Sequence, residues 1–501
     1  MDKSIIIIGA GLAGLSAGCY GQMNGCQSHI FEHHTKPGGV AATWKRKDYL
    51  VDGGIHWLMG YKPGQSSYEM YRELGALPSS RCLEMRTYAH FVDEAAGKSV
   101  EIIRDLKMLA SELKAISPAD FRVIDDLVDG ARRLQGYNLF GTFMSKPPEL
   151  MGPFAWMKTM WGLRQVFFNY FNGRYAQPVA DHAQSFQDPW LRRAIENLFL
   201  PEVPVWFILM LLALLADGQM GLLESGSLEF ALTIEQRYRE LGGQVTYKAM
   251  VEEILVEHDQ AVGVRLADGS EHRADVIVSA ADGYSTIYEM LGGLYVNKRI
   301  ESRYQNWKLF RPIVLVSFGV AREFRNEPSM NIILLKQPLT VGHQNIEGIS
   351  LRIFNYSPRF APSGKTVVQA MFETEWDFWS ELRKDRARYE VEKERIAREV
   401  LERLEARYPG LSSLVEITDV ATPYTTWRYT RNYRGAFEGW LPSTEVINTN
   451  VERTLPGLSN LYMAGQWVMP GGGVPACLYS GRHVVQILCQ QDRNEFVTNT
   501  T

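Results

Sequence analysis

The chain begins with a short apolar run followed by a glycine pattern, and this feature constrains its fold more than any other. Residues 4–8 read Ser-Ile-Ile-Ile-Ile, and Gly9, Gly11 and Gly14 follow with the spacing G-x-G-x-x-G. A stretch of small residues suited to a closely packed helix comes next, and a second apolar run ends on Glu32. The order strand, glycine turn, helix, strand and acid is typical of a dinucleotide-binding βαβ unit. A glycine pattern alone also occurs at an ordinary turn before a helix, so it is this context that favours the dinucleotide site.

Each position of the pattern has a physical role. Gly9 permits a tight turn, Gly11 lets the backbone approach a pyrophosphate, and Gly14 allows a helix to pack closely on a strand. The helix that begins at Leu12 and Ala13 offers free amide groups and a partial positive charge to a phosphate. Glu32 is placed to accept hydrogen bonds from an adenosine ribose. These residues do not distinguish NAD from FAD.

The next segment separates the two cofactors. It contains Pro37-Gly38-Gly39, then Thr43, a strand-like run at 49–52, and Gly53-Gly54-Ile55-His56-Trp57. This segment resembles the FAD-binding amine oxidase and phytoene desaturase superfamily. The resemblance implies that Gly38 and Gly39 clamp FAD and that Gly53, Gly54, Ile55 and His56 form a turn near the isoalloxazine ring. The family usually has Arg directly after the glycine pair, whereas this chain has Val40, and Lys45 or Arg46 are candidates to replace that phosphate contact.

The C-terminal end of the chain points to the same family. A strand-like run at 458–464 leads into Gly465 and Gln466, and a second glycine cluster follows as Gly471-Gly472-Gly473-Val474-Pro475. This closely resembles the C-terminal signature of phytoene desaturases, carotenoid isomerases and retinol saturases. The resemblance implies a second helix N-terminus against the flavin. Gln466 stands where many flavoproteins have an acid for the ribityl chain, and an amide also hydrogen-bonds a hydroxyl. The resemblance further implies that the Val251 backbone meets the adenine and that residues 275–281, which include Ala280, form a strand returning to the FAD sheet.

The resemblance also implies the fold class and the domains. We expect an α/β fold with a Rossmann-like FAD-binding domain of the glutathione reductase type and a discontinuous substrate domain of mixed sheet and helices. Residues 1–69, 221–294 and 451–495 would form the first domain, and residues 70–220 and 295–450 the second. Strand-like runs at 313–320, 331–335, 349–354 and 366–372 predict a sheet in the second domain, and residues 391–408 have helical spacing.

Residues 150–216 raise the question of membrane contact. The stretch 154–171 is rich in aromatic residues, and Lys158, Arg164 and Arg174 are interspersed with or follow them. Two interpretations stay open: a membrane-associating helical region, or the inner wall of the substrate domain. The uncharged run 203–216 contains Pro204 and falls short of the roughly 20 residues that span a bilayer. We therefore expect a buried helix there and no transmembrane helix.

Composition excludes other classes. The formal net charge of -4 gives no basic excess for binding nucleic acid. The five cysteines are scattered and odd in number, which predicts reduced thiols in a cytoplasmic protein, no disulfides and no bound metal. The N-terminus lacks the basic region of a signal peptide. We expect a cytoplasmic protein, and the membrane-contact interpretation would place it at a membrane surface.

No Ser-His-Asp order and no second glycine fingerprint for a nicotinamide cofactor occurs, so we expect the flavin to carry the chemistry. The resemblance implies an FAD-dependent oxidoreductase that desaturates or saturates a carbon-carbon bond of a hydrophobic polyene or isoprenoid. Two alternatives stay open: a carotenoid cis-trans isomerase that uses reduced FAD without net redox change, and a flavin amine oxidase. The sequence does not identify the electron acceptor.

The candidate residues for this chemistry are few. His56 is the titratable side chain that the resemblance places near the ring, where it is a candidate proton donor or acceptor. The alternative is a histidine hydrogen-bonded to backbone that only shapes the turn. Trp427 and Arg428, with Arg431 nearby, resemble a family segment that faces the substrate, although both arginines could equally form ion pairs between domains.

Overall fold

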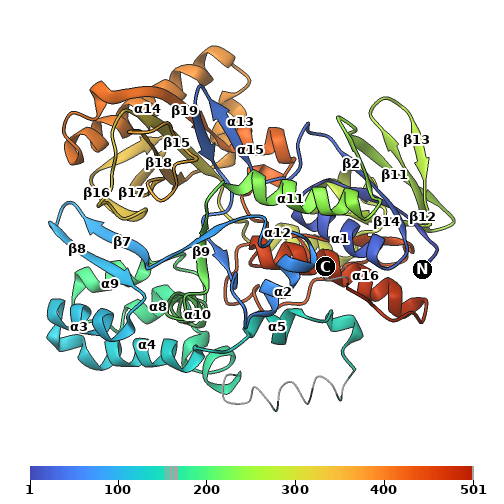
Figure 1. Cartoon of the computed structure of the whole chain (residues 1–501), viewed down its shortest axis with the longest axis horizontal. Coiled ribbons are helices and arrows are strands. Elements are labelled where there is room, and N and C mark those ends of the chain that lie inside the picture. The colour runs from blue at the N-terminus through green and yellow to red at the C-terminus, as the bar shows by residue number, and fades with distance from the viewer. Residues whose placement is uncertain (153, 155–156, 158–160, 162–166, 499–501) are drawn as a thin grey trace.

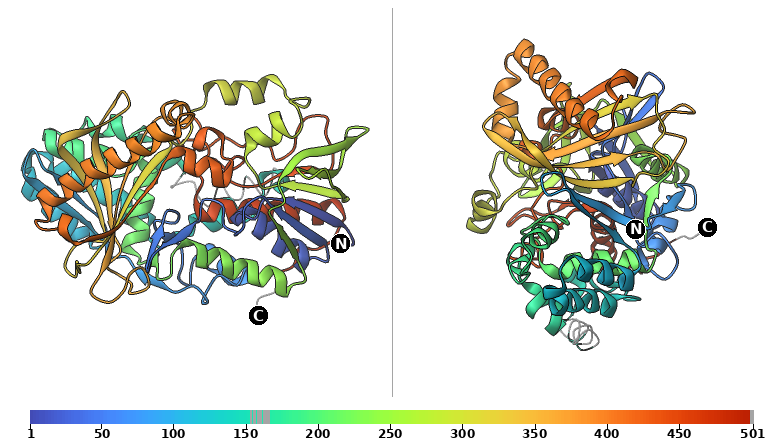
Figure 2. Two further views of the ribbon diagram at one scale, coloured as in Figure 1. Left: turned by 90° about the horizontal axis from the view of Figure 1, so that it is seen from above. Right: turned by 90° about the vertical axis from the view of Figure 1, so that its left-hand side faces the viewer.

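A computed structural model describes residues 1–152, 154, 157, 161 and 167–498. Two large sheets lie at opposite ends of the molecule, and helices surround both (Figure 1). The view from above in Figure 2 shows the same separation, with the N-terminal strands in one sheet and the yellow and orange strands in the other.

The first sheet has five parallel strands in the order β10-β2-β1-β14-β20. Helix α1 (Leu12–Met23) connects β1 to β2, which confirms the predicted βαβ unit. Side chains alternate along a strand, so Ile5 and Ile7 pack toward the helices while Ile6 and Ile8 face the opposite side. The strands are β1 (Ser4–Ile8), β2 (Gln27–Glu32), β10 (Gln244–Tyr247), β14 (Val276–Ser279) and β20 (Leu461–Met463).

Different elements cover the two faces of this sheet. Helices α1, α11 (Ser227–Glu240) and α16 (Gly473–Gln491) pack on one face. A three-stranded sheet packs on the other, formed by β11 (Val251–Glu257), β12 (Gln260–Leu266) and β13 (Glu271–Arg273). A parallel sheet covered on both faces has to be apolar throughout, which explains the run of four isoleucines.

The second large sheet is mixed, in the order β19-β15-β18-β17-β16-β7-β8. Only β16 and β7 pair in parallel in the described sheet. The four predicted strands are confirmed, and two extend further because β16 and β17 form a long hairpin whose outer part is partly exposed. The strands are β7 (Thr87–Asp93), β8 (Lys98–Ile103), β15 (Ile313–Val320), β16 (Met330–Val341), β17 (Gln344–Ile353), β18 (Thr366–Glu373) and β19 (Val415–Ala421).

Helices α13 (Trp376–Leu382) and α14 (Arg386–Arg407) cover one side of this sheet, and α15 (Pro423–Thr430) follows β19 (Figure 1). The predicted helix at 391–408 is confirmed, and it begins earlier because the Asp385 side chain accepts a hydrogen bond from the Arg388 amide and caps it. The other large helical group comprises α3 (Leu106–Ile116), α4 (Phe121–Leu134), α5 (Leu139–Met144), α8 (Val179–Ala183), α9 (Pro189–Glu196) and α10 (Val205–Ala216).

The remaining elements connect these layers. They are α2 (Ser66–Glu73), α12 (Lys298–Asn306), β3 (Thr43–Arg46), β4 (Tyr49–Asp52), β5 (Leu58–Met59), β6 (Cys82–Glu84) and β9 (Met220–Leu223). Helix α10 starts directly after Pro204, and its side chains are almost all buried, so the prediction of a buried helix is confirmed. No helix in the described part of the chain is long and apolar enough to cross a membrane.

The described residues of the aromatic segment at 154–171 lie partly on the surface and partly on an inner wall, so neither the membrane interpretation nor the inner-wall interpretation fits all of them. Trp156, Lys158, Met160, Leu163, Arg164 and Val166 lie outside the described residues. Of the others, Phe154, Met157, Trp161 and Phe168 are 78%, 57%, 71% and 67% exposed. Phe171, by contrast, turns inward and packs its ring 4.7 Å from that of Trp206 on α10. The end of the segment thus belongs to an inner wall, while its earlier described side chains face outward.

Candidate flavin and substrate cavity

A large cavity, with a volume of about 1710 Å³, connects the two sheets. It begins at the carboxyl ends of β1, β2 and β14, where open α/β sheets bind ligands, and it extends to the inner side of β16, β17 and β18. Sites for one small molecule usually measure about 300–1,000 Å³. The cavity therefore has room for a dinucleotide and a second molecule together.

Most of the predicted site residues come together on its wall. The lining includes Gly9, Gly11, Leu12, Ala13, Glu32, Gly38, Gly39, Gly54, Ile55, His56, Val251, Ala280, Trp427, Gly465, Gln466, Gly472, Gly473, Val474 and Pro475. Gly14, Gly53 and Arg428 do not line it.

The first glycine turn has the shape that a pyrophosphate requires. A Cβ on Gly14 would lie 2.0 Å from the carbonyl oxygen of Gly9, so only glycine lets α1 pack this closely on the turn. A Cβ on Gly11 would meet no protein atom within 4 Å and would project into open space at the cavity wall. The space beside Gly11 is thus free for a ligand to approach the backbone and the N-terminus of α1. These residues fit a dinucleotide phosphate.

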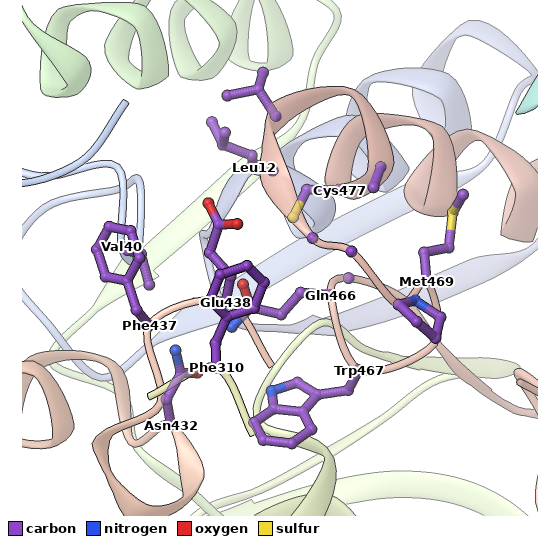
Figure 3. A pocket seen from close by; sticks show the side chains of 18 of the residues that line it. Leu12, Val40, Phe310, Asn432, Phe437, Glu438, Gln466, Trp467, Met469 and Cys477 are labelled. Carbon is purple, nitrogen blue, oxygen red and sulfur yellow. The ribbon is translucent and has the colours of Figure 1, made fainter. Parts of the chain in front are cut away.

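The C-terminal glycines form a second cradle beside the first, where a Cβ on Gly465 would lie 3.6 Å from the Ala13 Cβ. Gly465, Gly472 and Gly473 all have positive φ values, of 108°, 55° and 77°, and Gly473 is the first residue of α16. The Gly465 amide donates a hydrogen bond to the Ser480 hydroxyl at 2.6 Å, which ties the turn to α16. Figure 3 shows the Gln466 side chain in this part of the cavity. A second helix N-terminus therefore faces the same space as the first.

Glu32 is held as a charged acceptor at the end of β2. Its Oε2 accepts from the Ala10 amide at 2.7 Å and its Oε1 from the His34 amide at 2.8 Å, and the His33 ring lies 3.0 Å away. Burial alone would raise the pKa of this carboxyl, but the hydrogen bonds from His33, His34 and Ala10 hold the pKa below its ordinary value. The carboxylate is therefore ionised at neutral pH and still lines the cavity, as ribose binding requires.

A buried network fixes the turn at 53–56. Asp52 accepts hydrogen bonds from the Ser227 hydroxyl at 2.6 Å and from the Gly54 amide at 3.1 Å. The Ile55 amide in turn donates to the Ser227 hydroxyl at 2.6 Å. Burial raises the pKa of Asp52. Since Gly226 and Ser227 begin α11, this network ties the turn to a helix of the first sheet and presents Ile55 and His56 to the cavity.

His56 lies on the cavity wall with its ring stacked on Phe437, the two centroids 5.8 Å apart. Burial, and secondarily the charge of Arg352, hold the pKa of this imidazole well below its ordinary value. No described residue hydrogen-bonds the ring, and its Nε2 is buried without a partner in this part of the chain. The ring is thus neutral, and the backbone hydrogen bond of the turn-shaping alternative is absent from the described structure.

Two sequence-based assignments need correction. Arg46 pairs with Asp419 at 2.6 Å, and Lys45 lies 3.7 Å from Asp48, so neither faces the cavity or replaces the missing arginine. Arg428 is exposed, rests over the Tyr429 ring at 5.4 Å and does not line the cavity. The helical turn separates it from Trp427, which does line the cavity, and this removes Arg428 from the candidate substrate contacts.

Glu438 is a cavity residue that sequence reasoning missed. It lines the wall and forms no hydrogen bond or ion pair with a described residue, and burial raises the pKa of its carboxyl to about 7. Figure 3 shows the carboxylate pointing toward Leu12 and Cys477, with Phe310 and Phe437 close by. A Cβ on Gly472 would lie 2.9 Å from the Glu438 Cβ, so this loop packs directly on the second cradle. No sequence pattern sets Glu438 apart from the other 56 Asp and Glu residues, since Asp52, Asp217 and Asp282 also stand directly before a glycine.

The far half of the cavity is lined mainly by apolar side chains. Its side chains come from the loop at 197–201, from α10 and from β16 to β18. Trp57 continues this wall from the turn, with its ring 5.4 Å from Tyr88 and 6.5 Å from Phe199. The apolar lining includes Leu198, Phe199, Trp206, Phe207, Met210, Ile332, Leu334, Ile349 and Met371. A ligand in this half would be selected mainly by the shape of the apolar wall.

Comparison with known proteins agrees with this geometry. The family model described as flavin containing amine oxidoreductase matches residues 12–489. The chain is 25% identical to the chloroplastic prolycopene isomerase of Arabidopsis thaliana, covering 95% of this chain and 81% of that protein. It is 24% identical to a lycopene-forming phytoene desaturase of a Paracoccus species, covering 97% of each. It is 23% identical to the all-trans-retinol 13,14-reductase of Danio rerio, covering 93% of this chain and 83% of that protein.

The fold has solved counterparts too. An oxidoreductase from Methanosarcina mazei superimposes with a TM-score of 0.60 at 15% identity, covering 96% of this chain and all of the other. The family match over almost the whole chain, the two glycine cradles and the ionised Glu32 lead to one conclusion. The chain belongs to the flavin-containing amine oxidoreductase family and is an FAD-dependent oxidoreductase.

Proposed function

We propose that the protein desaturates or saturates a carbon-carbon bond of a hydrophobic polyene or isoprenoid. The observation that carries this proposal is the continuity of the cavity, which joins the two glycine cradles to an apolar half without a partition. A polyene offers few hydrogen-bonding groups, so an apolar wall suits it better than it suits a charged amine. The likeness to a phytoene desaturase and to a retinol reductase supports the same substrate class.

Cis-trans isomerisation of a polyene is the second candidate, and the likeness to prolycopene isomerases favours it. Both reactions require the same placement of the substrate. Desaturation removes two hydrogens from the substrate and saturation adds two, whereas isomerisation leaves its composition unchanged.

The residues divide into two sets. We assign FAD binding to Gly9, Gly11, Leu12, Ala13, Gly14, Glu32, Gly38, Gly39, Gly53, Gly54, Ile55, His56, Val251, Ala280, Gly465, Gln466, Gly472, Gly473, Val474 and Pro475. Residues 1–69, 221–294 and 451–495 would form the FAD-binding domain, and residues 70–220 and 295–450 the substrate-binding domain. The five strands of the parallel sheet all come from the first set of segments. Trp427 and the apolar wall would orient the substrate.

FAD, when bound, supplies the hydride chemistry. The protein has to hold the substrate bond against the flavin, exclude water and exchange one proton. His56 suits the last task, because its neutral ring lies on the wall, stacks on Phe437 and has an unpartnered Nε2 within the described structure. In a desaturation the substrate loses one hydrogen as hydride and one as a proton, and a neutral imidazole can accept that proton.

We also propose contact with a membrane surface through the region around 150–216. Phe154, Met157, Trp161 and Phe168 are exposed apolar side chains next to the helical group that forms the cavity wall. Such a patch would let a lipid-soluble substrate enter from a bilayer. Co-sedimentation with lipid vesicles tests this: substitution of Phe154 and Phe168 by Ser should reduce binding, and equal binding by the wild type and the double variant would contradict it.

The mass of the product tests the proposed reaction. FAD-loaded protein, in oxidised and in reduced form, is incubated without oxygen with all-trans and cis polyenes, and the products are separated and weighed by mass spectrometry. A loss or gain of two hydrogens supports desaturation or saturation, and a changed geometry at constant mass supports isomerisation. Oxidation of amines with no change in any polyene would contradict the proposal.

A further inference from the structure

Arg431 is a cavity cation that has no carboxylate partner among the described residues. Three arginines line the cavity, and two of them are paired: Arg311 with Glu202 and Glu373 at 3.1 and 2.9 Å, and Arg453 with Glu149 at 2.8 Å. Arg431 forms no ion pair with any residue that the structure describes, and its Nε is buried without a hydrogen-bond partner there. A partly buried guanidinium without a hydrogen-bonded anion is energetically unfavourable, so an anionic ligand is expected to bind it.

The backbone at this position is unusual for arginine. Arg431 ends α15 with φ 58° and ψ 13°, a left-handed conformation that glycine usually adopts after a helix. For a residue with a side chain this conformation is energetically unfavourable. The guanidinium is nevertheless held firmly, with Cζ 4.5 Å from the centroid of the Trp427 ring and Nη2 3.9 Å from the Met250 sulfur.

These contacts place Arg431 in the nucleotide half of the cavity. Met250 directly precedes Val251 at the start of β11. The Tyr433 amide donates a hydrogen bond to Asp282 at 2.7 Å, just beyond the end of β14. The Tyr429 ring lies 5.0 Å from that of His34, just beyond the end of β2. Arg431 therefore lies among the strand ends where the glycine turns form the first cradle.

A pyrophosphate bound there needs a cation. Seven acidic side chains line the cavity, Glu32 and Asp282 among them, against three arginines of which two are already paired. Val40 occupies the position directly after Gly39, and Lys45 and Arg46 are engaged on the outside. We propose that Arg431 supplies the positive charge that binds the pyrophosphate of FAD. The inference rests on the assignment of FAD as cofactor and adds a residue from the end of α15 to its binding site.

The test compares FAD affinities in FAD-free protein, followed by the quenching of flavin fluorescence. Three variants are needed: R431N, since asparagine tolerates the left-handed conformation, R431K, which keeps the charge, and R428N as the matched control at an exposed position of the same helix. R431N should weaken FAD binding by about 10- to 100-fold. R431K should lose less, and R428N should stay within about twofold of the wild type.

Salt provides a second measurement that does not depend on a fully native variant. FAD binding by the wild type should weaken as ionic strength rises, and binding by R431N should respond less, because its cation is gone. An R431N variant that binds FAD as tightly as the wild type at low salt, and instead shows a raised KM for the polyene, would overturn the inference and assign Arg431 to the substrate. Failure of the wild type itself to bind FAD would contradict the cofactor assignment instead.

Discussion

Substituting Gly11 and Gly14 separately by alanine distinguishes the two roles that glycine has in the first cradle. At Gly14 the new Cβ would lie 2.0 Å from the Gly9 carbonyl oxygen, and real Cβ atoms essentially never approach closer than 3.0 Å. The helix would have to move by about 1 Å, and overpacking of this kind costs about 1–3 kcal/mol. G14A should therefore lower the free energy of unfolding of FAD-free protein by that amount, and also weaken FAD binding.

At Gly11 the expected result differs. Its φ of -66° accepts alanine, and the new Cβ meets no protein atom within 4 Å. G11A should leave the unfolding free energy of FAD-free protein unchanged within about 0.5 kcal/mol. The methyl group nevertheless occupies the space where the pyrophosphate approaches, so FAD affinity should fall by about 5- to 150-fold, which corresponds to the same 1–3 kcal/mol.

Urea unfolding of FAD-free protein and a fluorescence titration with FAD measure the two quantities independently. Unchanged FAD affinity in G11A would refute the placement of the pyrophosphate beside this turn. Unchanged stability in G14A would refute the packing argument.

Three further predictions concern other parts of the molecule. Burial raises the pKa of Glu438 from 4.5 to about 7 in the folded protein, so folding favours the protonated carboxyl. The wild type should therefore lose stability relative to E438Q as the pH rises from about 4.5 to about 7, by at most about 3 kcal/mol. The same difference in unfolding free energy between the two proteins at about pH 5 and at about pH 8, measured with urea, would contradict this. Leu209 in α10 is fully buried, so L209A should cost about 2–5 kcal/mol in urea unfolding, whereas L232A, at an exposed site of α11, should stay within about 0.5 kcal/mol; equal losses would argue against the core assignment. H56N, assayed at saturating FAD, should lose about 10²- to 10⁴-fold in polyene turnover, and since the pKa of His56 lies well below its ordinary value, the wild-type rate should not follow imidazole ionisation between pH 6 and 8; a turnover equal to that of the wild type would remove His56 from the chemistry.

The cofactor end of the molecule could be predicted from the sequence because its determinants are local. The glycines of the first turn, Glu32 and the C-terminal cluster lie in short contiguous segments, and each has a conformational reason to be that residue. Gly14 packs on Gly9 only five residues away, and Gly472 and Gly473 stand directly before α16. The strand runs of the second sheet were predictable for the same reason, since alternation and turn residues are read within a few positions.

The remainder of the site depends on contacts between distant segments. Glu438 has a raised pKa because the folded chain buries it, on a loop that packs on Gly472. Arg311 and Arg453 pair with carboxylates from distant segments, whereas Arg431 has no such partner among the described residues. Arg428 and Arg431 are three residues apart and looked equivalent in the sequence. In the structure Arg431, at the end of α15, lines the cavity, whereas Arg428 is exposed and does not line it.

Anaerobic mixing of the FAD-loaded protein with a desaturable polyene, followed by flavin absorbance, tests the central claim most directly. The account predicts that the purified protein shows the bands of oxidised flavin and that these bleach when the polyene is added, as electrons pass from substrate to cofactor. If only the reduced protein reacts, saturation of the polyene would reoxidise the flavin, and isomerisation would leave the flavin reduced. Either result would keep a polyene as the substrate. Flavin bands that respond to no polyene in either redox state, or a protein that shows no flavin even after FAD is added, would contradict it.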